Sequence, residues 1–195
     1  MLANIIEAPS RQTRLMQQTF RCTLSALAEP LRPLSLPEVT APEGIGTALW
    51  AMVLTLLDHD VTVYWPDMNE SMRANLVFHT GVQIAEEPEK ADWVVLHSDD
   101  PNAESVLDRV PIGTHERPDA ATSILMLTSN ASTDVLAEGP GFENPQELKV
   151  KLSESLVYRV IQNNQQYPLG FDLFLVGEHS VTCLPRSTRL MMRTD

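Results

Sequence analysis

Three short apolar segments, separated by stretches with helical spacing, constrain the fold of this chain more than any other feature. They cover Val61–Trp65, Trp93–His97 and Ser123–Leu127, and each has the length of a buried strand. A short helix is predicted over Asn69–His79 and a helical turn over Ala103–Arg109. This β-α-β alternation is typical of an α/β sheet that is covered by helices.

Two helices and a long connection are predicted before the first of these strands. The first helix begins near Ser10 and ends before Pro30, and it has one apolar stripe at helical spacing, formed by Met16, Phe20, Leu24 and Leu27. The second, Thr47–Leu57, is apolar nearly all round, which predicts a central position in the core. Between them, Glu29–Gly46 contains four prolines and two glycines. We expect a long irregular connection or an extended edge segment there.

The C-terminal third predicts one further helix and a closing hairpin. Asn144 is placed to cap this helix, Pro145 suits its first position, and Glu147 follows at capping-box spacing. The apolar face would then consist of Leu148, Leu152, Leu156 and Val160. A strand is possible over Asp134–Ala137, and the hairpin joins Phe171–Val176 to Val181–Leu184.

Size and charge limit the classes of function. The 195 residues suit one α/β domain over 1–195, and the net charge of −12 disfavours nucleic acid and anionic membranes as partners. The longest apolar stretch, Ala48–Leu57, is too short to cross a bilayer, and the N-terminus lacks a signal-peptide pattern. Cys22 and Cys183 are expected to be buried free thiols. We therefore expect a cytoplasmic protein.

Motifs for a self-contained active site are not found in the sequence. Asp58-His59-Asp60 could be a metal triplet, but polar residues are expected in a turn between a helix and a strand. Schiff-base chemistry needs a lysine in an apolar pocket, whereas Lys90, Lys149 and Lys151 each lie in a polar run beside acidic residues. We therefore predict no catalytic residue, no metal and no cofactor.

Three local features remain as candidate ligand-binding sites. Gly139-Pro140-Gly141 precedes the predicted helix and could hold an anion, or it could be a plain turn. His79 lies beside Gly81 where a helix C-cap is expected. In the segment 185–189, two arginines flank two hydroxyls, which suits either a phosphate site or a surface loop. The candidate residues are Arg186, Arg189, His79, Gly139 and Gly141.

These features belong to an ordered set of short segments by which the chain resembles the PhnH family, the H subunit of the bacterial carbon–phosphorus lyase core complex. Tyr167, Phe171 and Ser187 are mild departures from the residues usual in that family. The matching segments are Phe20-Arg21, Ala28-Glu29-Pro30, Leu54–Asp58, Phe78-His79-Thr80, Gly113-Thr114, Pro118–Thr122, Gly139-Pro140-Gly141, Tyr167–Asp172 and Pro185–Thr188.

The resemblance implies a fold, an assembly and a role. The fold would be a three-layer α/β/α domain with a mixed sheet, similar to pyridoxal-phosphate-dependent transferases but without the cofactor site. The chain would form a homodimer and join the G, I and J subunits of the core complex. That complex takes part in making ribose 1-methylphosphonate 5-triphosphate from methylphosphonate and ATP.

We weigh three hypotheses for function. The first is a non-catalytic subunit that docks on the catalytic subunits, with the long segment 29–46 as one candidate docking arm. The second is a module that binds a phosphonate or a nucleotide through the candidate residues above. The third is an independent enzyme on a transferase-like fold.

Overall fold

The computed structural model describes residues 4–193, and its centre is a seven-stranded sheet in the order β1-β9-β8-β5-β4-β2-β3. Five neighbouring strands, β3, β2, β4, β5 and β8, run parallel. β9 is antiparallel to both of its neighbours, so the sheet is mixed. The strands are β1 (Leu34–Ser35), β2 (Thr62–Tyr64), β3 (Gln83–Ile84), β4 (Trp93–His97), β5 (Ser123–Leu127), β8 (Asp172–Val176) and β9 (Ser180–Leu184).

A second, smaller sheet is antiparallel and has the order β10-β6-β7. Its strands are β6 (Thr133–Glu138), β7 (Gln146–Val150) and β10 (Arg189–Met192). The α/β class and the mixed main sheet are confirmed, and the strand expected over Asp134–Ala137 is confirmed as β6, whereas its pairing with β7 and β10 in a separate sheet was not expected.

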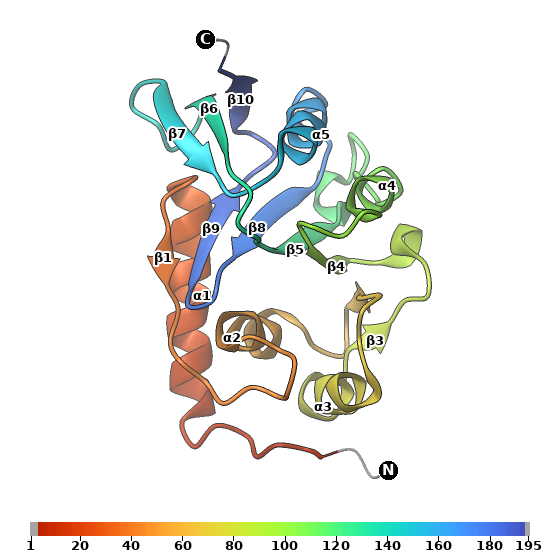
Figure 1. Ribbon diagram of the computed structural model, residues 1–195. Helices are drawn as coiled ribbons and strands as arrows, with labels where there is room; N and C mark the ends of the chain where they lie inside the picture. Colours follow the sequence, from red (N-terminus) through yellow and green to blue (C-terminus); the bar gives the residue numbers. More distant parts are fainter. Residues whose placement is uncertain (1–3, 194–195) are drawn as a thin grey trace.

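Helices cover both faces of the main sheet (Figure 1). One side carries α1 (Gln12–Ala28), α2 (Thr47–Leu56) and α3 (Glu70–Thr80), and α2 is buried over most of its length. The other side carries α4 (Ala103–Leu107), α5 (Glu154–Asn164) and the small sheet. Short 3₁₀ turns occur at Pro88–Lys90 and Pro118–Ala120. None of the helices within residues 4–193 has the length and apolar character needed to span a membrane.

The apolar strands lie where the sequence predicts them. β4 and β5 have the predicted bounds, and their central residues are buried on both faces of the sheet. The hairpin of β8 and β9 is confirmed, as are the helices α2 and α3. The strands β4 and β5 are predictable because a parallel sheet covered on both faces requires short, continuously apolar strands.

The predicted helix start at Asn144 is wrong. Residues 146–150 form β7, which pairs with β6 and places Leu148 opposite Val135. The helix begins only at Glu154, where the Ser153 side chain accepts a hydrogen bond from the Leu156 amide. Leu148, Val150 and Leu152 also recur with a period of two, and strand pairing with β6 overrides the local capping pattern.

The apolar stripe of α1 faces the core only in part: Leu27 packs against it, but the two central residues of the stripe do not. Phe20 and Leu24 are 53% and 56% exposed. The residues of α1 that are buried are small, namely Thr19, Thr23 and Ala26. Small side chains allow α1 to lie close to α2 and β9, so close packing of the backbones decides which side of the helix is buried.

The long segment 29–46 is fixed along the edge of the main sheet. β1 pairs with β9, and the amides of Leu31 and Leu36 donate to carbonyls of Cys183 and His179. The Thr47 hydroxyl closes its end by bonding both backbone groups of Val39. The extended edge segment is therefore observed over residues 31–36, whereas residues 37–46 form the irregular connection that the sequence also left open.

Candidate functional site

Three of the family-like segments meet at one arginine, although they are distant in the sequence. The Arg186 guanidinium forms a two-pronged ion pair with Asp172, with Nη2 2.5 Å from Oδ2 and Nε 3.1 Å from Oδ1. It also donates to the Pro118 carbonyl at 2.8 Å. The Arg186 amide donates to the same Asp172 carboxylate. We call Pro118, Asp172 and Arg186 the Arg186 cluster.

Two buried asparagines at the end of α5 hold the strands around this cluster. The Asn163 side chain accepts from the Phe171 amide and donates to the Phe171 carbonyl, both at 2.9 Å. Asn164 donates to the Thr188 carbonyl. Buried amide side chains with both groups bonded act as fixed connections between backbone segments. The helix therefore sets the positions of both segments that supply Arg186 and Asp172.

The glycines of the segment 139–141 are required by close contacts. Gly139 has φ +118°, and a Cβ there would lie 2.9 Å from the Ser187 carbonyl oxygen. Gly141 has φ +91°, and its Cβ would collide with Pro30 and lie 2.6 Å from the Ala28 carbonyl oxygen. The turn is therefore packed directly against Ser187 on one side and against Ala28 and Pro30 on the other. The plain turn that the sequence left open accounts for both glycines.

The Arg186 cluster has the chemistry of a structural ion pair. The side chains of Arg186 and Asp172 are 14% and 24% exposed, and the carboxylate already neutralises the guanidinium. A phosphate would have to displace Asp172 to form a comparable two-pronged contact. The assignment of Arg186 to ligand binding stays a prediction, and the geometry gives this arginine an occupied carboxylate partner.

Arg189 is nearby but differs from Arg186 in its exposure. Its side chain is 77% exposed and has one long contact, 3.4 Å, with Glu138. It borders a surface hollow of about 390 Å³ together with Tyr167 and Met191. Of the candidate residues in this region, Arg189 is the one with its guanidinium accessible to a ligand.

His79 lies on the other side of the main sheet and is not brought together with the arginines. Its Nε2 lies 3.1 Å from the Ile6 carbonyl oxygen, and its ring meets Trp50 edge-on. On the same helix, the buried Asn75 side chain accepts from the Ile6 amide and donates to the Asn4 carbonyl. His79 and Asn75 therefore fasten the N-terminal segment to α3. The expected C-cap at Gly81 is confirmed, with φ +72°.

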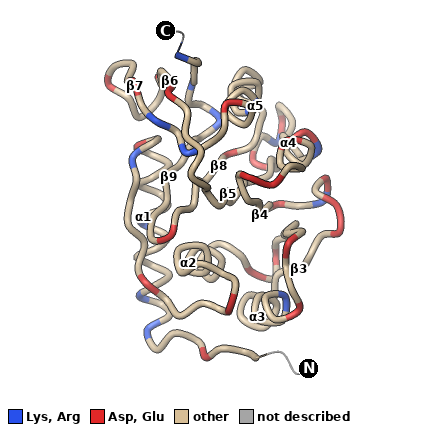
Figure 2. The backbone as a smooth tube through the Cα atoms, in the orientation of Figure 1, with Lys and Arg blue, Asp and Glu red and all other residues tan. Residues whose placement is uncertain are grey.

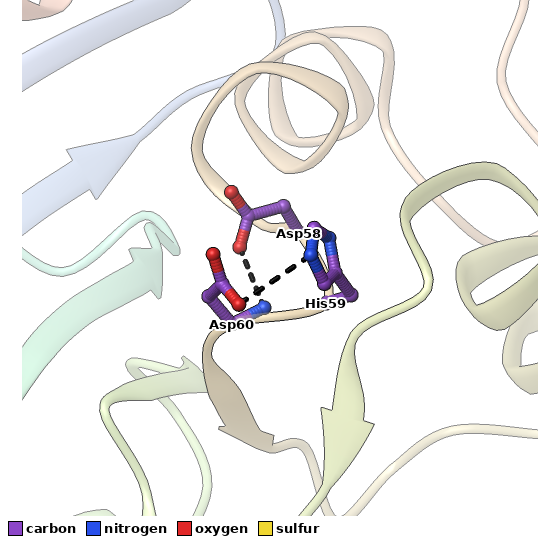
Figure 3. A group of neighbouring side chains, drawn as sticks. All are labelled: Asp58, His59 and Asp60. Carbon is purple, nitrogen blue, oxygen red and sulfur yellow. Dashed lines mark hydrogen bonds and ion pairs between the residues drawn. The ribbon is translucent and has the colours of Figure 1, made fainter.

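Asp58, His59 and Asp60 are the one group within residues 4–193 whose side chains lie close enough together to share a metal ion (Figure 3). His59 Nε2 lies 3.4 Å from Asp60 Oδ1, and both side chains are 79% exposed. Asp58 accepts a hydrogen bond from the Asp60 amide, which closes the turn between α2 and β2. The arrangement is that of a solvated turn, as the sequence suggests.

The lysines are at the surface, as predicted, and of the two thiols expected to be buried Cys183 is buried whereas Cys22 is only half-buried. Lys90, Lys149 and Lys151 are exposed, and the first two contact Glu87 and Asp134. Both cysteines are free thiols. Burial, and to a lesser degree the nearby Asp172, raises the pKa of the Cys183 thiol well above its usual range, which makes it a poor nucleophile.

The residues that organise this region were largely missed from the sequence. In the sequence, Asp172 stands out only as the last residue of a family-like segment, and Asn163 and Asn164 belong to none of these segments. The available signal was two adjacent amides immediately after the apolar face of a helix, where buried polar groups need partners. Their partners are eight and 24 residues away, so no local pattern identifies them.

Comparison with known proteins supports the family resemblance that these segments indicate. Residues 8–191 match the family described as bacterial phosphonate metabolism protein (PhnH). The chain is 28% identical over 180 residues to the α-D-ribose 1-methylphosphonate 5-triphosphate synthase subunit PhnH of Rhizobium meliloti (strain 1021), with 89% of each chain covered. It is also 26% identical over 193 residues to protein HtxG of Stutzerimonas stutzeri, covering 97% of this chain and 90% of that one.

Proposed function

The chain belongs to the PhnH family of bacterial phosphonate metabolism proteins, and from this membership we propose that it is the PhnH-type subunit of an α-D-ribose 1-methylphosphonate 5-triphosphate synthase. The observation that carries the proposal is the match over residues 8–191, which leaves few residues outside the family region. In this role the protein contributes to the use of methylphosphonate and ATP in phosphonate catabolism.

Within that enzyme we propose a non-catalytic role, with residues 1–195 acting as one unit. The geometry of the Arg186 cluster supports this proposal, because its charged groups satisfy one another. The proposed partners are a second copy of the chain and the G, I and J subunits of the carbon–phosphorus lyase core complex.

Co-expression with these subunits tests the proposed function. Tagged G, I or J subunit should retain this chain through purification, and the complete set should form the triphosphate product from methylphosphonate and ATP. A set that lacks only this chain should lose assembly or turnover. Normal assembly and turnover without the chain would refute the proposal.

A ligand-binding module is the second candidate, favoured by the accessible Arg189 beside a hollow of about 390 Å³. Calorimetry with ATP and with methylphosphonate decides it. Binding to the wild type that is weakened at least tenfold by Arg189→Ala would support this candidate. The absence of measurable heat with both the isolated chain and the complex would exclude it.

We also propose kinship with the fold of pyridoxal-phosphate-dependent transferases, with loss of the cofactor site. The mixed seven-stranded sheet covered by helices on both faces supports this, as does the exposure of Lys90, Lys149 and Lys151. Pyridoxal phosphate added to the pure chain should then give no saturable imine absorbance. A saturable signal abolished by replacing one lysine would contradict the proposed loss.

A further inference from the structure

The exposed face of α1 combines apolar side chains with positive charge in an otherwise acidic protein. Phe20 and Leu24, four residues apart, are 53% and 56% exposed. Arg14, Gln18 and Arg21 follow at spacings of four and three, so they form an exposed stripe alongside this pair. We call Arg14, Gln18, Phe20, Arg21 and Leu24 the α1 face.

Within residues 4–193, neither Arg14 nor Arg21 of the α1 face has a carboxylate within 4.0 Å. Of eleven arginines in the chain, seven lie within 4.0 Å of a carboxylate among residues 4–193. The other four are Arg11, Arg14, Arg21 and Arg73. Arg14 and Arg21 lie in α1, and Arg11 directly precedes it. Carboxylates outnumber basic groups 26 to 14, so two arginines in one helix without a carboxylate partner among residues 4–193 are a local exception. Figure 2 shows how the basic and acidic residues are distributed along the backbone.

A groove runs beside the α1 face, between α1 and residues 35–40. It consists of two hollows of about 730 and 420 Å³, which share Gln18 and Pro37 as lining residues. The smaller hollow is lined by Arg21, Cys22 and Leu36 among others. Glu7 and Glu38 line the larger one beside the arginines, which disfavours capture of a small free anion there.

We propose that the α1 face and the smaller hollow, which has no acidic lining residue, dock an acidic segment with apolar side chains on another subunit of the synthase. The inference rests on the proposed function and names the surface that serves it. Arginine and aromatic side chains are the groups most enriched in the energetic centres of protein interfaces. Carboxylates of the partner would neutralise Arg14 and Arg21, while its apolar groups would cover Phe20 and Leu24.

Charge argues for a different subunit over a second copy of this chain. In a two-fold symmetric dimer the same patch occurs on both sides of the interface. The α1 face would then bring two sets of arginines together without carboxylates of its own, which is unfavourable in a desolvated contact. The homodimer expected for the chain therefore needs another surface.

A paired charge reversal tests the docking surface. The variant carrying Arg14→Glu and Arg21→Glu is compared with a control carrying Lys151→Glu and Arg73→Glu, which changes the charge equally at two other exposed positions outside the α1 face. Both variants should unfold at the wild-type urea concentration, because all four side chains are exposed. The α1 variant should bind the co-expressed G, I and J subunits at least about tenfold more weakly, with the control unchanged.

Alkylation of Cys22 gives an independent measurement on the wild-type protein. This half-buried thiol lines the groove, so iodoacetamide should modify it more slowly in the assembled complex than in the isolated chain. Equal rates, together with equal binding by the α1 variant, would overturn the docking surface while leaving the proposed function intact. A wild-type chain that does not co-purify with the other subunits would overturn both.

The oligomeric state of the isolated chain tests the other possible occupant of the α1 face, which is a second copy of the chain. Sedimentation of the isolated α1 variant should match the wild type. A dimer that dissociates on this charge reversal would show that a second copy covers the α1 face, and it would refute docking of another subunit there.

Discussion

At the scale of single residues, the donors of Arg186 are directed inward, to Asp172 and to the Pro118 carbonyl. A guanidinium held in this way connects the strand β8, the loop after β9 and the 3₁₀ turn that begins at Pro118. Its presence in a family-like segment is then explained by folding, because removal of either partner would leave a partly buried charge.

Replacing Arg186 should therefore lower stability more than it changes any ligand affinity. Arg186→Ala should reduce the free energy of unfolding by roughly 2–4 kcal/mol, and Arg186→Lys by less, since lysine keeps the charge but loses the two-pronged geometry. Urea denaturation measures both. The matched control is Arg189→Ala, whose exposed side chain predicts a change within about 0.5 kcal/mol. Unaltered stability of Arg186→Ala would contradict the structural role.

At the scale of elements, the boundary between β7 and α5 shows how a tertiary contact overrides a local signal. Asn144 and Glu147 have the spacing of a helix start, yet residues 146–150 pair with β6. The helix cap is provided nine residues later by Ser153. Strand pairing satisfies the backbone of this segment and buries Val150, which a helix starting at Asn144 would not achieve against β6.

Two alanine substitutions distinguish these helix starts. Ser153→Ala should reduce the free energy of unfolding by about 0.5–1 kcal/mol, because it removes the side chain that caps α5. Asn144→Ala should leave it within about 0.5 kcal/mol, because Asn144 is exposed and lies outside the helix. Equilibrium unfolding measures both variants. The reverse order of effects would indicate that the helix begins at Asn144.

The N-terminal segment is held to α3 by hydrogen bonds of the Asn75 side chain. Asn75→Ala should destabilise the protein by about 1–3 kcal/mol and release residues 4–8, because three hydrogen bonds of 2.9 Å depend on its side chain. Hydrogen exchange of the Ile6 amide measures the release. Asn75→Asp keeps the acceptor for that amide and should retain more of its protection. Full protection in the alanine variant would contradict the attachment.

At the scale of the whole molecule, two cores lie on opposite faces of the main sheet. Cys183 is fully buried in the core beneath α1, α2 and α3, whereas Cys22 is half-buried at the surface of α1. The two thiols therefore report on different events. Modification of Cys22 requires only local access, and modification of Cys183 requires separation of the helices from the sheet.

Thiol reagents should modify Cys22 in the folded protein and Cys183 only as the protein unfolds. Stability should also fall as pH rises above about 8.5, where the unfolded thiol ionises, because burial raises the pKa of folded Cys183 and keeps it protonated. Urea midpoints at successive pH values measure this decline. Cys183→Ala, although less stable throughout, should decline less steeply; the same slope in both proteins would contradict the assignment.

The sequence alone determined the central strands of the main sheet and the helices α2 and α3. Short apolar runs in β4 and β5, the apolar helix α2 and the hairpin of β8 and β9 follow from patterns within a few residues. The ordered segments also indicated the family. These features are local or cumulative along the chain, so periodicity and composition are sufficient to reveal them.

Only the tertiary structure decided which groups are engaged and which are accessible. It paired Arg186 with Asp172, placed His79 on the opposite side of the sheet, and turned Phe20 and Leu24 toward solvent. Each outcome depends on close packing between segments that are distant in sequence. A side chain's spacing predicts the face of its own element, but the neighbouring element determines whether that face is covered.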